Sequence, residues 1–352
     1  MARYKHRPIA TFLFTGDFEP DYNRTRILRR GLEALGHTVT ELRYSRKRRP
    51  VRAAVRAAAA GADVIFLPSF AHADVRFTKR CLPDRRLIFD PLISRYLTKV
   101  HDYRQVHRWS PRAWKNRWKD RRALAAADLV LTDTEAHAAY FHREYDIPAC
   151  KFRTLYIGAE SDLFYPAEFS TTGTLRIGFY GAFAPLQGVE TILRAAHLLR
   201  DRTELQWEII GSGFDYTRCR RLATALSLPR LTWRDWLPFA ELPGAIRSYD
   251  ICLGIFGESL KTDLVIPNKI YHYAACGKPV ITADTAAVRE LFIDRKNILL
   301  CQKSPEDLAR KVLQLLDPAV RATIGDGAAQ VLQGLGHRAI ARRFLQALEI
   351  KY

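Results

Sequence analysis

The chain has 352 residues and a formal net charge of +19 at pH 7, and 48% of its residues are hydrophobic. This length exceeds one ordinary hydrophobic core and fits two domains of common size. The apolar runs are far shorter than the roughly 20 residues of a membrane-spanning helix, which argues against a membrane-embedded segment.

The positive charge is uneven along the chain. Residues 1–167 contain 32 Lys and Arg against 18 Asp and Glu, a net charge of +14, and the remaining residues contribute +5. This asymmetry predicts that the first half meets an anionic partner, such as phosphate-rich lipid, nucleic acid or a charged glycan.

The first apolar stretch is short and follows several basic residues. It is interrupted by Thr11, which favours a first strand over a signal peptide. The six cysteines are widely spaced without a C-x-x-C pair, as expected for free, buried thiols in a reducing cytosol. Neither an aspartate-x-aspartate signature nor a His/Cys cluster is present, so we expect no metal and no cofactor.

Short apolar segments alternate with helical patterns through the first half of the chain. The helices expected at Arg24–Leu35 and Val51–Ala60 are each followed by glycine, the usual helix stop. This alternation predicts a doubly wound parallel sheet. Its strands are expected at Ile9–Thr15, Thr38–Leu42, Asp63–Leu67, Arg86–Asp90, Leu129–Thr132 and Thr154–Ile157.

The same pattern restarts after a polar linker at Pro166–Thr174. Its strands are expected at Leu175–Tyr180, Gln206–Ile210, Leu231–Trp233, Ile251–Ile255, Pro279–Thr282 and Asn297–Leu300. The fold class is therefore α/β with two tandem doubly wound, Rossmann-like domains. We expect the first domain to span residues 1–167 and the second to span 168–336.

The segment from Ile251 to Leu300 is the most informative. An apolar strand leads into a polar loop with Glu258, Lys261 and Asp263, and Pro267 then opens a helix. Such a loop, at the carboxyl end of a parallel strand and before a helix N-terminus, is where open α/β sheets bind ligands. Helix N-termini with nearby lysines favour phosphate, although each lysine could instead be solvated.

This segment resembles the donor-site region of family-4 glycosyltransferases, which have the GT-B fold. The resemblance extends in the family's order over Asp21–Leu42, Ala127–Phe141, Phe152–Pro166, Arg176–Leu199 and Trp207–Leu228. It implies a metal-independent enzyme that transfers a sugar from a nucleotide-diphosphate sugar with retention of anomeric configuration. It also implies that a last helix, at about 337–352, returns to the first domain.

The first loop of the donor domain departs from the family pattern. The family places an arginine and a lysine where this chain has Ala182 and Gln187. The resemblance therefore implies that other groups bind the donor diphosphate in this chain. The candidates are Gly181, Gln187, Gly188, Lys261, Asn268 and Lys269.

The family's two glutamates, which hold the donor sugar and its ribose, are also replaced. Their positions carry Leu264 and His272 here. His272 is either a ribose contact or a helix-surface histidine. Glu258 is the candidate for the sugar contact, and Glu290, expected at the start of a helix, is either a nucleotide contact or a helix-dipole partner.

The resemblance implies that the first domain binds the acceptor and also contacts the transferred sugar. Gly16 follows the first strand and is a donor candidate, because a glycine there lets the backbone approach a phosphate or sugar. Asn23 and Arg24 open the next helix, where they could hold an acceptor or a pyrophosphate. Asp102 is the expected polar contact to the transferred sugar, with His101 in reserve.

A basic segment from Arg104 to Arg122 contains eight Lys and Arg with three tryptophans among them. Such a mixture suits the headgroup layer of an anionic membrane. The alternative is a helix whose tryptophans pack on the domain and whose charges are solvated. A second basic run, Arg43–Arg56, is expected on the same face. The candidate contacts are Arg112, Trp114, Lys115, Arg117, Trp118 and Lys119.

The function expected from these features is that of a cytoplasmic, retaining glycosyltransferase in glycan biosynthesis. It would be peripheral at the inner face of the membrane and would act on a lipid-linked glycan. Two alternatives stay open: a nucleotide-sugar epimerase, and a nucleic-acid-binding protein on a degenerate glycosyltransferase fold.

Overall fold

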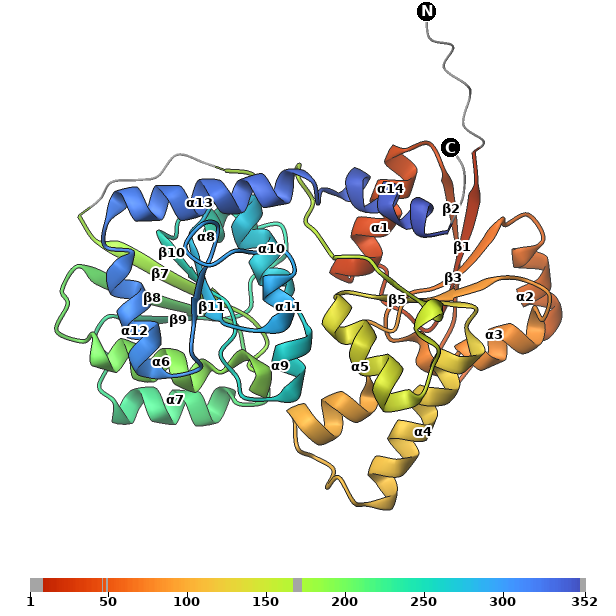
Figure 1. Cartoon of the computed structure of the whole chain (residues 1–352), viewed down its shortest axis with the longest axis horizontal. Helices are drawn as coiled ribbons and strands as arrows, with labels where there is room; N and C mark the ends of the chain where they lie inside the picture. The colour runs from red at the N-terminus through yellow and green to blue at the C-terminus, as the bar shows by residue number, and fades with distance from the viewer. Residues whose placement is uncertain (1–8, 46, 49, 167–172, 349–352) are drawn as a thin grey trace, which may run out of the picture. The chain divides into compact units, whose positions relative to one another are not determined.

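The computed structural model describes residues 9–45, 47–48, 50–166 and 173–348. The chain divides into two compact units, both visible in Figure 1. The first unit consists of the described residues within Met1–Val100, Arg104–Ile157 and His337–Tyr352. The second unit consists of those within His101–Tyr103 and Gly158–Gly336. The expected boundary after residue 167 and much of the expected linker lie outside the described residues, so the exact domain limits stay a prediction.

The described part of the first unit is built on a parallel sheet in the order β2-β1-β3-β4-β5-β6. Its strands are β1 (Thr11–Gly16), β2 (Thr38–Arg43), β3 (Val64–Leu67), β4 (Leu87–Phe89), β5 (Leu129–Thr132) and β6 (Phe152–Thr154). The predicted strands match these in order. The exception in position is β6, which pairs with β5 from Phe152 to Thr154 and ends before the predicted Ile157.

Helices cover both faces of this sheet. The long helix α1 (Asn23–Ala34) packs against α14 (His337–Ala347), so the last helix belongs to the first unit. Gly31 is required at this contact because a Cβ there would collide with the backbone carbonyl of His337. The remaining helices are α2 (Arg52–Ala59), η1 (Ala71–Ala73), α3 (Val75–Cys81), α4 (Pro111–Ala126), α5 (Glu135–Tyr145) and η3 (Ala149–Lys151).

The described part of the second unit has a parallel sheet in the order β12-β11-β10-β7-β8-β9. Counted from β7, this is the strand order of dinucleotide-binding folds, whose ligand crevice lies where the order reverses, here between β7 and β10. The strands are β7 (Leu175–Tyr180), β8 (Leu205–Ile210), β9 (Leu231–Arg234), β10 (Ile251–Leu253), β11 (Val280–Ala283) and β12 (Leu299–Cys301).

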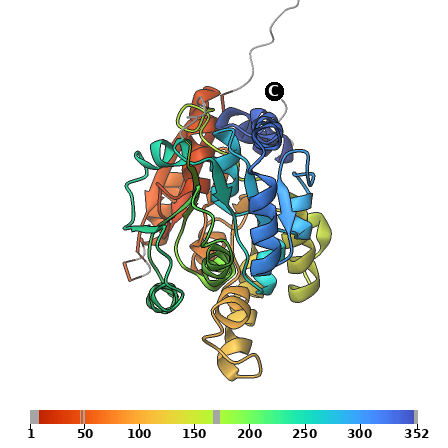
Figure 2. The ribbon, with the colours of Figure 1, turned by 90° about the vertical axis from the view of Figure 1, so that its left-hand side faces the viewer.

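Two helical layers enclose this second sheet. Helix α6 packs against α7 and α12, and α10 packs against α8 and α13, as Figure 2 lets the reader follow. The core between the sheet and the first layer includes Phe179, Ile192, Leu253 and Leu308. The helices are η4 (Pro185–Gln187), α6 (Val189–Leu198), α7 (Tyr216–Ala225), α8 (Leu242–Arg247), α9 (Leu260–Leu264), α10 (Asn268–Ala275), α11 (Ala286–Arg289), α12 (Pro305–Gln314) and α13 (Pro318–Gln333).

The structure bears on two expectations from the sequence, the absence of a membrane-spanning helix and the state of the cysteines. Within the described residues, no helix is both long enough and apolar enough to cross a membrane. All six cysteines are free, and five of them are buried. Cys150 is exposed because it lies in the short surface helix η3, so the expectation of a buried thiol is wrong for that residue.

Candidate functional site

The crevice of the second unit is formed by the loops that follow β7 and β10. The two loops are joined by backbone hydrogen bonds, from Phe256 N to Gln187 O at 3.1 Å and from Gly257 N to Leu186 O at 3.0 Å. Gly188, which precedes α6, has φ +63°, and a Cβ there would collide with the Phe256 backbone. The glycine therefore allows the close approach of two loops that both lie at the carboxyl ends of parallel strands.

Lys269 lies beside the loop that follows β7. Its side chain leaves the first turn of α10, is 3% exposed, and donates a hydrogen bond from Nζ to Gln187 Oε1. The same Nζ lies 3.6 Å from the centroid of the Phe179 ring, a cation–π contact. Burial lowers the pKa of Lys269 well below its ordinary value. The loss of hydration on burial is poorly compensated for this ammonium group, so a bound anion would strongly stabilise its charged form.

Lys269 also lies beside the first loop. A Cβ placed on Gly181 would lie 2.9 Å from Lys269 Nζ, so the glycine makes room for this ammonium group. The amide of Gly181 itself donates to Ile210 O at 3.0 Å. Gly181, Gln187, Gly188 and Lys269, which are four of the predicted donor residues, are therefore brought together at one point.

Lys261 and Asp102 form a second group in this unit. Lys261 Nζ, on α9, lies 3.6 Å from Asp102 Oδ2, and Asp102 is 2% exposed. Burial raises the pKa of Asp102, and the charge of Lys261 and the hydroxyl of Ser259 oppose this rise. The two residues were predicted for different roles, as sugar contact and diphosphate ligand, and they lie in direct contact.

His272 is enclosed by aromatic rings. It is 3% exposed, its Nδ1 is 2.6 Å from the hydroxyl of Tyr180, and its ring stacks on Phe164 at 4.0 Å. The alternative of a helix-surface histidine is therefore wrong, because the side chain of His272 points into the unit. A ribose contact would have to use Nε2, which is itself buried.

The remaining donor candidates occupy the rim of this unit. Glu258 is exposed in the loop after β10, and Asn268 is half-buried at the first position of α10. Glu290 follows α11 as its C-cap, so the expectation that it begins a helix is wrong, and dipole stabilisation at a helix start does not apply to it. His101, half-buried, precedes Asp102.

The acceptor candidates lie in the first unit, at the carboxyl edge of its sheet. Gly16, a donor candidate that also lies in this unit, is the last residue of β1. Arg24 is 1% exposed and donates from Nε to Asp90 Oδ2 at 2.7 Å, and also to the carbonyl of Leu155. Arg24 thus ties α1 to the ends of two strands, and Asn23, 7% exposed, precedes it.

Helix α4 carries the basic and aromatic segment. Ser110 caps it by accepting a hydrogen bond from Ala113 N, and Pro111 occupies its first turn. Trp114 and Trp118 are 61% and 52% exposed, so their packing on the domain, the alternative interpretation, is wrong.

The cations of α4 differ in their surroundings. Arg112, Lys115 and Lys119 are exposed. Arg117 instead pairs with Glu144, with Nε 2.6 Å from Oε1, which raises the pKa of Arg117. Arg117 therefore forms an ion pair within the first unit, whereas Arg112, Lys115 and Lys119 are exposed.

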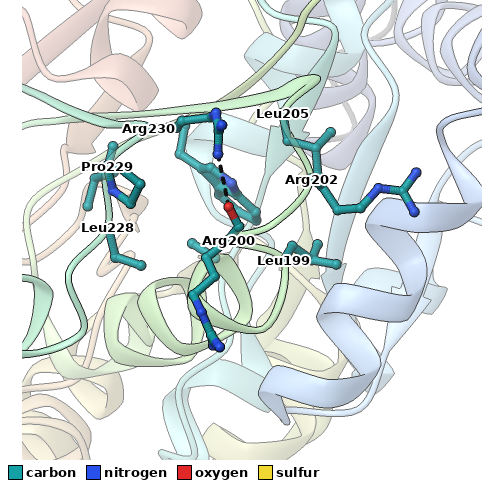
Figure 3. A pocket seen from close by; sticks show the side chains of 10 residues that line it. Leu199, Arg200, Arg202, Leu205, Leu228, Pro229 and Arg230 are labelled. Carbon is teal, nitrogen blue, oxygen red and sulfur yellow. Dashed lines mark hydrogen bonds between the residues drawn. The ribbon is translucent and has the colours of Figure 1, made fainter.

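A small hollow lies at the opposite end of the second sheet. It contains about 10 Å³ of free space among the starts of β8 and β9, where Arg230 Nη1 donates to Arg200 O at 2.9 Å (Figure 3). Because this is the amino end of the strands and the space holds about one water, we assign no ligand to it.

Sequence reasoning missed the groups that hold these side chains in place. Ser259 beside Asp102, and Phe164 and Tyr180 around His272, come from distant parts of the chain with no motif to link them. Across the described ranges, no group of three or more His, Cys, Asp and Glu side chains stands close enough to hold a metal ion.

Part of the second unit is similar to a known protein family. Residues 174–318 match the family described as glycosyl transferases group 1. The D-inositol 3-phosphate glycosyltransferase of Corynebacterium jeikeium is 27% identical over 226 residues, which are 57% of this chain and 52% of that protein. The protein of the same name from Arthrobacter is 27% identical over 245 residues, 64% of this chain and 56% of its own length. This chain thus spans about half the length of the curated relatives it matches.

Solved structures extend the similarity to almost the whole chain. HepE from Anabaena, solved with UDP and glucose, has a TM-score of 0.75 at 16% identity over 97% of this chain and 99% of its own. Sucrose-phosphate synthase from Thermosynechococcus elongatus has a TM-score of 0.75 at 18% identity over 97% of this chain and 98% of its own. The predicted pair of Rossmann-like domains is confirmed: the chain has the GT-B fold, and its residues 174–318 are similar to the glycosyl transferases group 1 family.

Proposed function

We propose that this chain is a retaining glycosyltransferase that transfers a sugar from a nucleotide-diphosphate sugar to an acceptor. The observation that carries the proposal is the position of Lys269: a buried, poorly compensated ammonium group at the crevice where this strand order binds nucleotides. The HepE structures were solved with UDP, UDP and glucose, or UDP-glucose, which makes a UDP-sugar the first donor to test.

The chemistry would rest on positioning and charge stabilisation. The leaving diphosphate develops negative charge, and Lys269 and Lys261 are the candidates to stabilise it. Asp102, in contact with Lys261, is the candidate to orient the transferred sugar. Retention follows from the resemblance to family-4 enzymes, in which the leaving phosphate helps to accept the proton of the attacking hydroxyl.

The proposal is tested by incubating the protein with UDP-glucose and related nucleotide sugars and measuring release of the nucleoside diphosphate. Release that depends on an added acceptor, with a glycosylated product, supports transfer. Conversion of one nucleotide sugar into another without release would favour the epimerase alternative instead.

Affinity for the nucleoside diphosphate is expected to fall as pH rises. The pKa of Lys269 is lowered in the free protein, and a bound diphosphate would raise it again, so binding takes up a proton. The decline should begin at the lowered pKa and level off near the ordinary lysine value of 10.5. Calorimetric titration in two buffers of different ionisation enthalpy would detect the uptake. An affinity and a binding heat that are both independent of pH and buffer would contradict it.

Transfer is expected to persist in excess EDTA. In the proposed mechanism the diphosphate charge is stabilised by Lys261, Lys269 and the N-terminus of α10, rather than by a divalent ion. The measurement is the rate of diphosphate release with EDTA and after addition of Mg²⁺ or Mn²⁺. Loss of turnover that either ion restores would overturn the metal-independent mechanism.

For the acceptor, we propose a lipid-linked glycan at the inner face of the membrane, with α4 on anionic lipid. The support is the exposed pair Trp114 and Trp118 among the exposed cations Arg112, Lys115 and Lys119. Helix α3 packs against both α2 and α4, so Arg52 and Arg56 of the second basic run, which lie on α2, belong to the same helical layer as α4. Arg46 and Arg49 of that run lie outside the described residues.

Flotation with anionic vesicles is expected to carry the protein, and neutral vesicles are expected to leave it behind. Each Lys or Arg near an anionic surface contributes about 1 kcal/mol, an attraction that salt weakens. Neutralising Arg112, Lys115 and Lys119 to glutamine should reduce flotation. The matched control neutralises Arg143, Arg153 and Arg220, whose side chains lie on other elements. Equal flotation of both variants on both lipids would rule out this electrostatic binding.

A further inference from the structure

A cavity of about 420 Å³ lies in the first unit, apart from every residue discussed as a donor ligand. It opens to solvent and is lined by residues of η1, α3, α4 and the segment after β4. Helices α3 and α4, labelled in Figure 1, pack against each other. This volume is large enough for a phosphate group and part of an organic molecule, since each water takes only about 30 Å³. We call it the arginine cavity.

The lining of the arginine cavity is strongly cationic. Five of its side chains are basic: Arg76, Arg80, Arg95, Lys119 and Arg122. They come from three separate segments of the chain, and none of the described residues that line the cavity carries a carboxylate. Like charges placed together in this way repel one another, so the arrangement is costly unless an anion occupies it.

An acidic side chain on α4 is hydrogen-bonded away from the lining of the cavity. Asp120, on α4, is 1% exposed and accepts hydrogen bonds from Ser94 Oγ at 3.0 Å and from Tyr96 N at 2.9 Å. It therefore faces an internal network and does not line the cavity. The pKa of Arg76 is lowered by partial desolvation and by the like charges of Arg122 and Arg80.

Aromatic rings complete the walls. Phe77 and Trp118 line the cavity, and the guanidinium of Arg122 stacks on the Trp118 ring at 4.1 Å from its centroid. This stacking holds one guanidinium fork in place, and guanidinium forks match phosphate oxygens in a bidentate manner. The combination of fixed guanidinium groups and apolar walls suits a phosphate ester better than a simple monovalent anion.

We propose that the arginine cavity binds a phosphate-bearing ligand, with the phosphate held by Arg76, Arg122 and their basic neighbours. The ligand is either a free phosphorylated molecule or the headgroup of a phospholipid, and both offer the same chemistry. This site is separate from the proposed donor site, and the inference stands whether or not the chain transfers sugars.

The test uses inorganic pyrophosphate and the full chain, titrated in a calorimeter in the Lys269→Met background so that the donor site contributes little. The double variant Arg76→Gln/Arg122→Gln should lose about tenfold or more in affinity. The control Arg143→Gln/Arg153→Gln removes the same charge from exposed arginines of the same unit and should bind pyrophosphate as the background does.

A second arm distinguishes the source of the phosphate. The same variants are mixed with vesicles of phosphatidylcholine alone or with phosphatidic acid. A selective loss of phosphatidic acid binding in the Arg76→Gln/Arg122→Gln variant, without pyrophosphate binding, assigns the cavity to a lipid headgroup. A selective loss of pyrophosphate binding assigns it to a free ligand. Equal behaviour of the double variant and its control in both arms overturns the proposal.

Folding of the double variant is checked by its melting temperature. Removal of two mutually repelling charges should leave this temperature unchanged or raise it. If the double variant does not fold, Arg76→Gln alone gives the same comparison, against Arg143→Gln as its control. A melting temperature that falls with no change in either binding arm would mean that these arginines serve only the fold.

Discussion

Replacement of Lys269 by methionine is expected to weaken binding of a nucleoside diphosphate by about tenfold or more, because a charge-assisted contact is worth about 1.5–3 kcal/mol. Methionine keeps most of the apolar length of lysine and removes only the ammonium group. Binding of the nucleoside without its phosphates should be almost unchanged, since Lys269 Nζ faces Gln187 and the loop after β7. Calorimetric titration of both ligands measures the difference.

The matched control for this substitution is Lys311→Met. Lys311 is 6% exposed, comparable with Lys269, but lies on α12, which follows the edge strand β12. Any general effect of removing a buried ammonium group should therefore occur in both variants. The loss of affinity should occur only in Lys269→Met. Equal diphosphate affinity in Lys269→Met and the unaltered protein would remove Lys269 from the donor site.

Asp102→Asn is expected to lower turnover by about 10²–10³, the usual effect of removing one preorganised polar contact from an active site. Asparagine has the same shape as aspartate and keeps the site filled, so diphosphate affinity should change little. The effect should appear in kcat rather than in the dissociation constant of the nucleotide. The donor is first identified by nucleotide release. Steady-state kinetics with that donor then gives kcat, and titration with the nucleoside diphosphate gives the dissociation constant.

The pH profile separates the carboxylate of Asp102 from a merely structural role. Burial raises the pKa of Asp102, so its carboxylate is lost at a higher pH than that of an ordinary aspartate as the solution is acidified. Turnover of the unaltered protein should fall on that acid limb, and Asp102→Asn should lack it. Asp263→Asn is the control, because Asp263 lies on α9 but pairs with Lys303 at 2.6 Å. Unchanged turnover in Asp102→Asn would return the sugar contact to the exposed Glu258.

The fold was accessible from the sequence because each strand is a short apolar run bounded by turn residues. Residues Leu129–Thr132 and Leu175–Tyr180 were predicted to the residue, since periodicity and punctuation agree there. The end of β6 was misplaced because its length depends on pairing with β5, and pairing is a tertiary property.

The candidate site was accessible only in part. A glycine-bounded loop and a lysine at a helix start can be located from the sequence, and Gly181, Gly188 and Lys269 do lie together. The exposure of a side chain cannot be found in this way. The sequence left open whether His272 is a ribose contact or a helix-surface residue, and stacking on Phe164, more than a hundred residues away, buries it.

The same limit explains the surface features of the first unit. The sequence indicated the basic character of α4, because its charges are consecutive in the chain. It did not show that Arg117 is paired with Glu144. Nor did it show that Arg76 and Arg95 join Arg122 around one cavity, because three separate segments must fold together to form it.

The central claim is that the second unit binds the diphosphate of a nucleotide sugar. A thermal-shift screen of the full chain against UDP, GDP, ADP and CDP, each beside its nucleoside, tests it most directly. A ligand that binds only the folded state at about a hundred times its dissociation constant stabilises the protein by about 2.7 kcal/mol. We expect at least one nucleoside diphosphate, with UDP first, to raise the melting temperature while its nucleoside does not. No rise with any diphosphate, or equal rises with diphosphates and nucleosides, would contradict the claim.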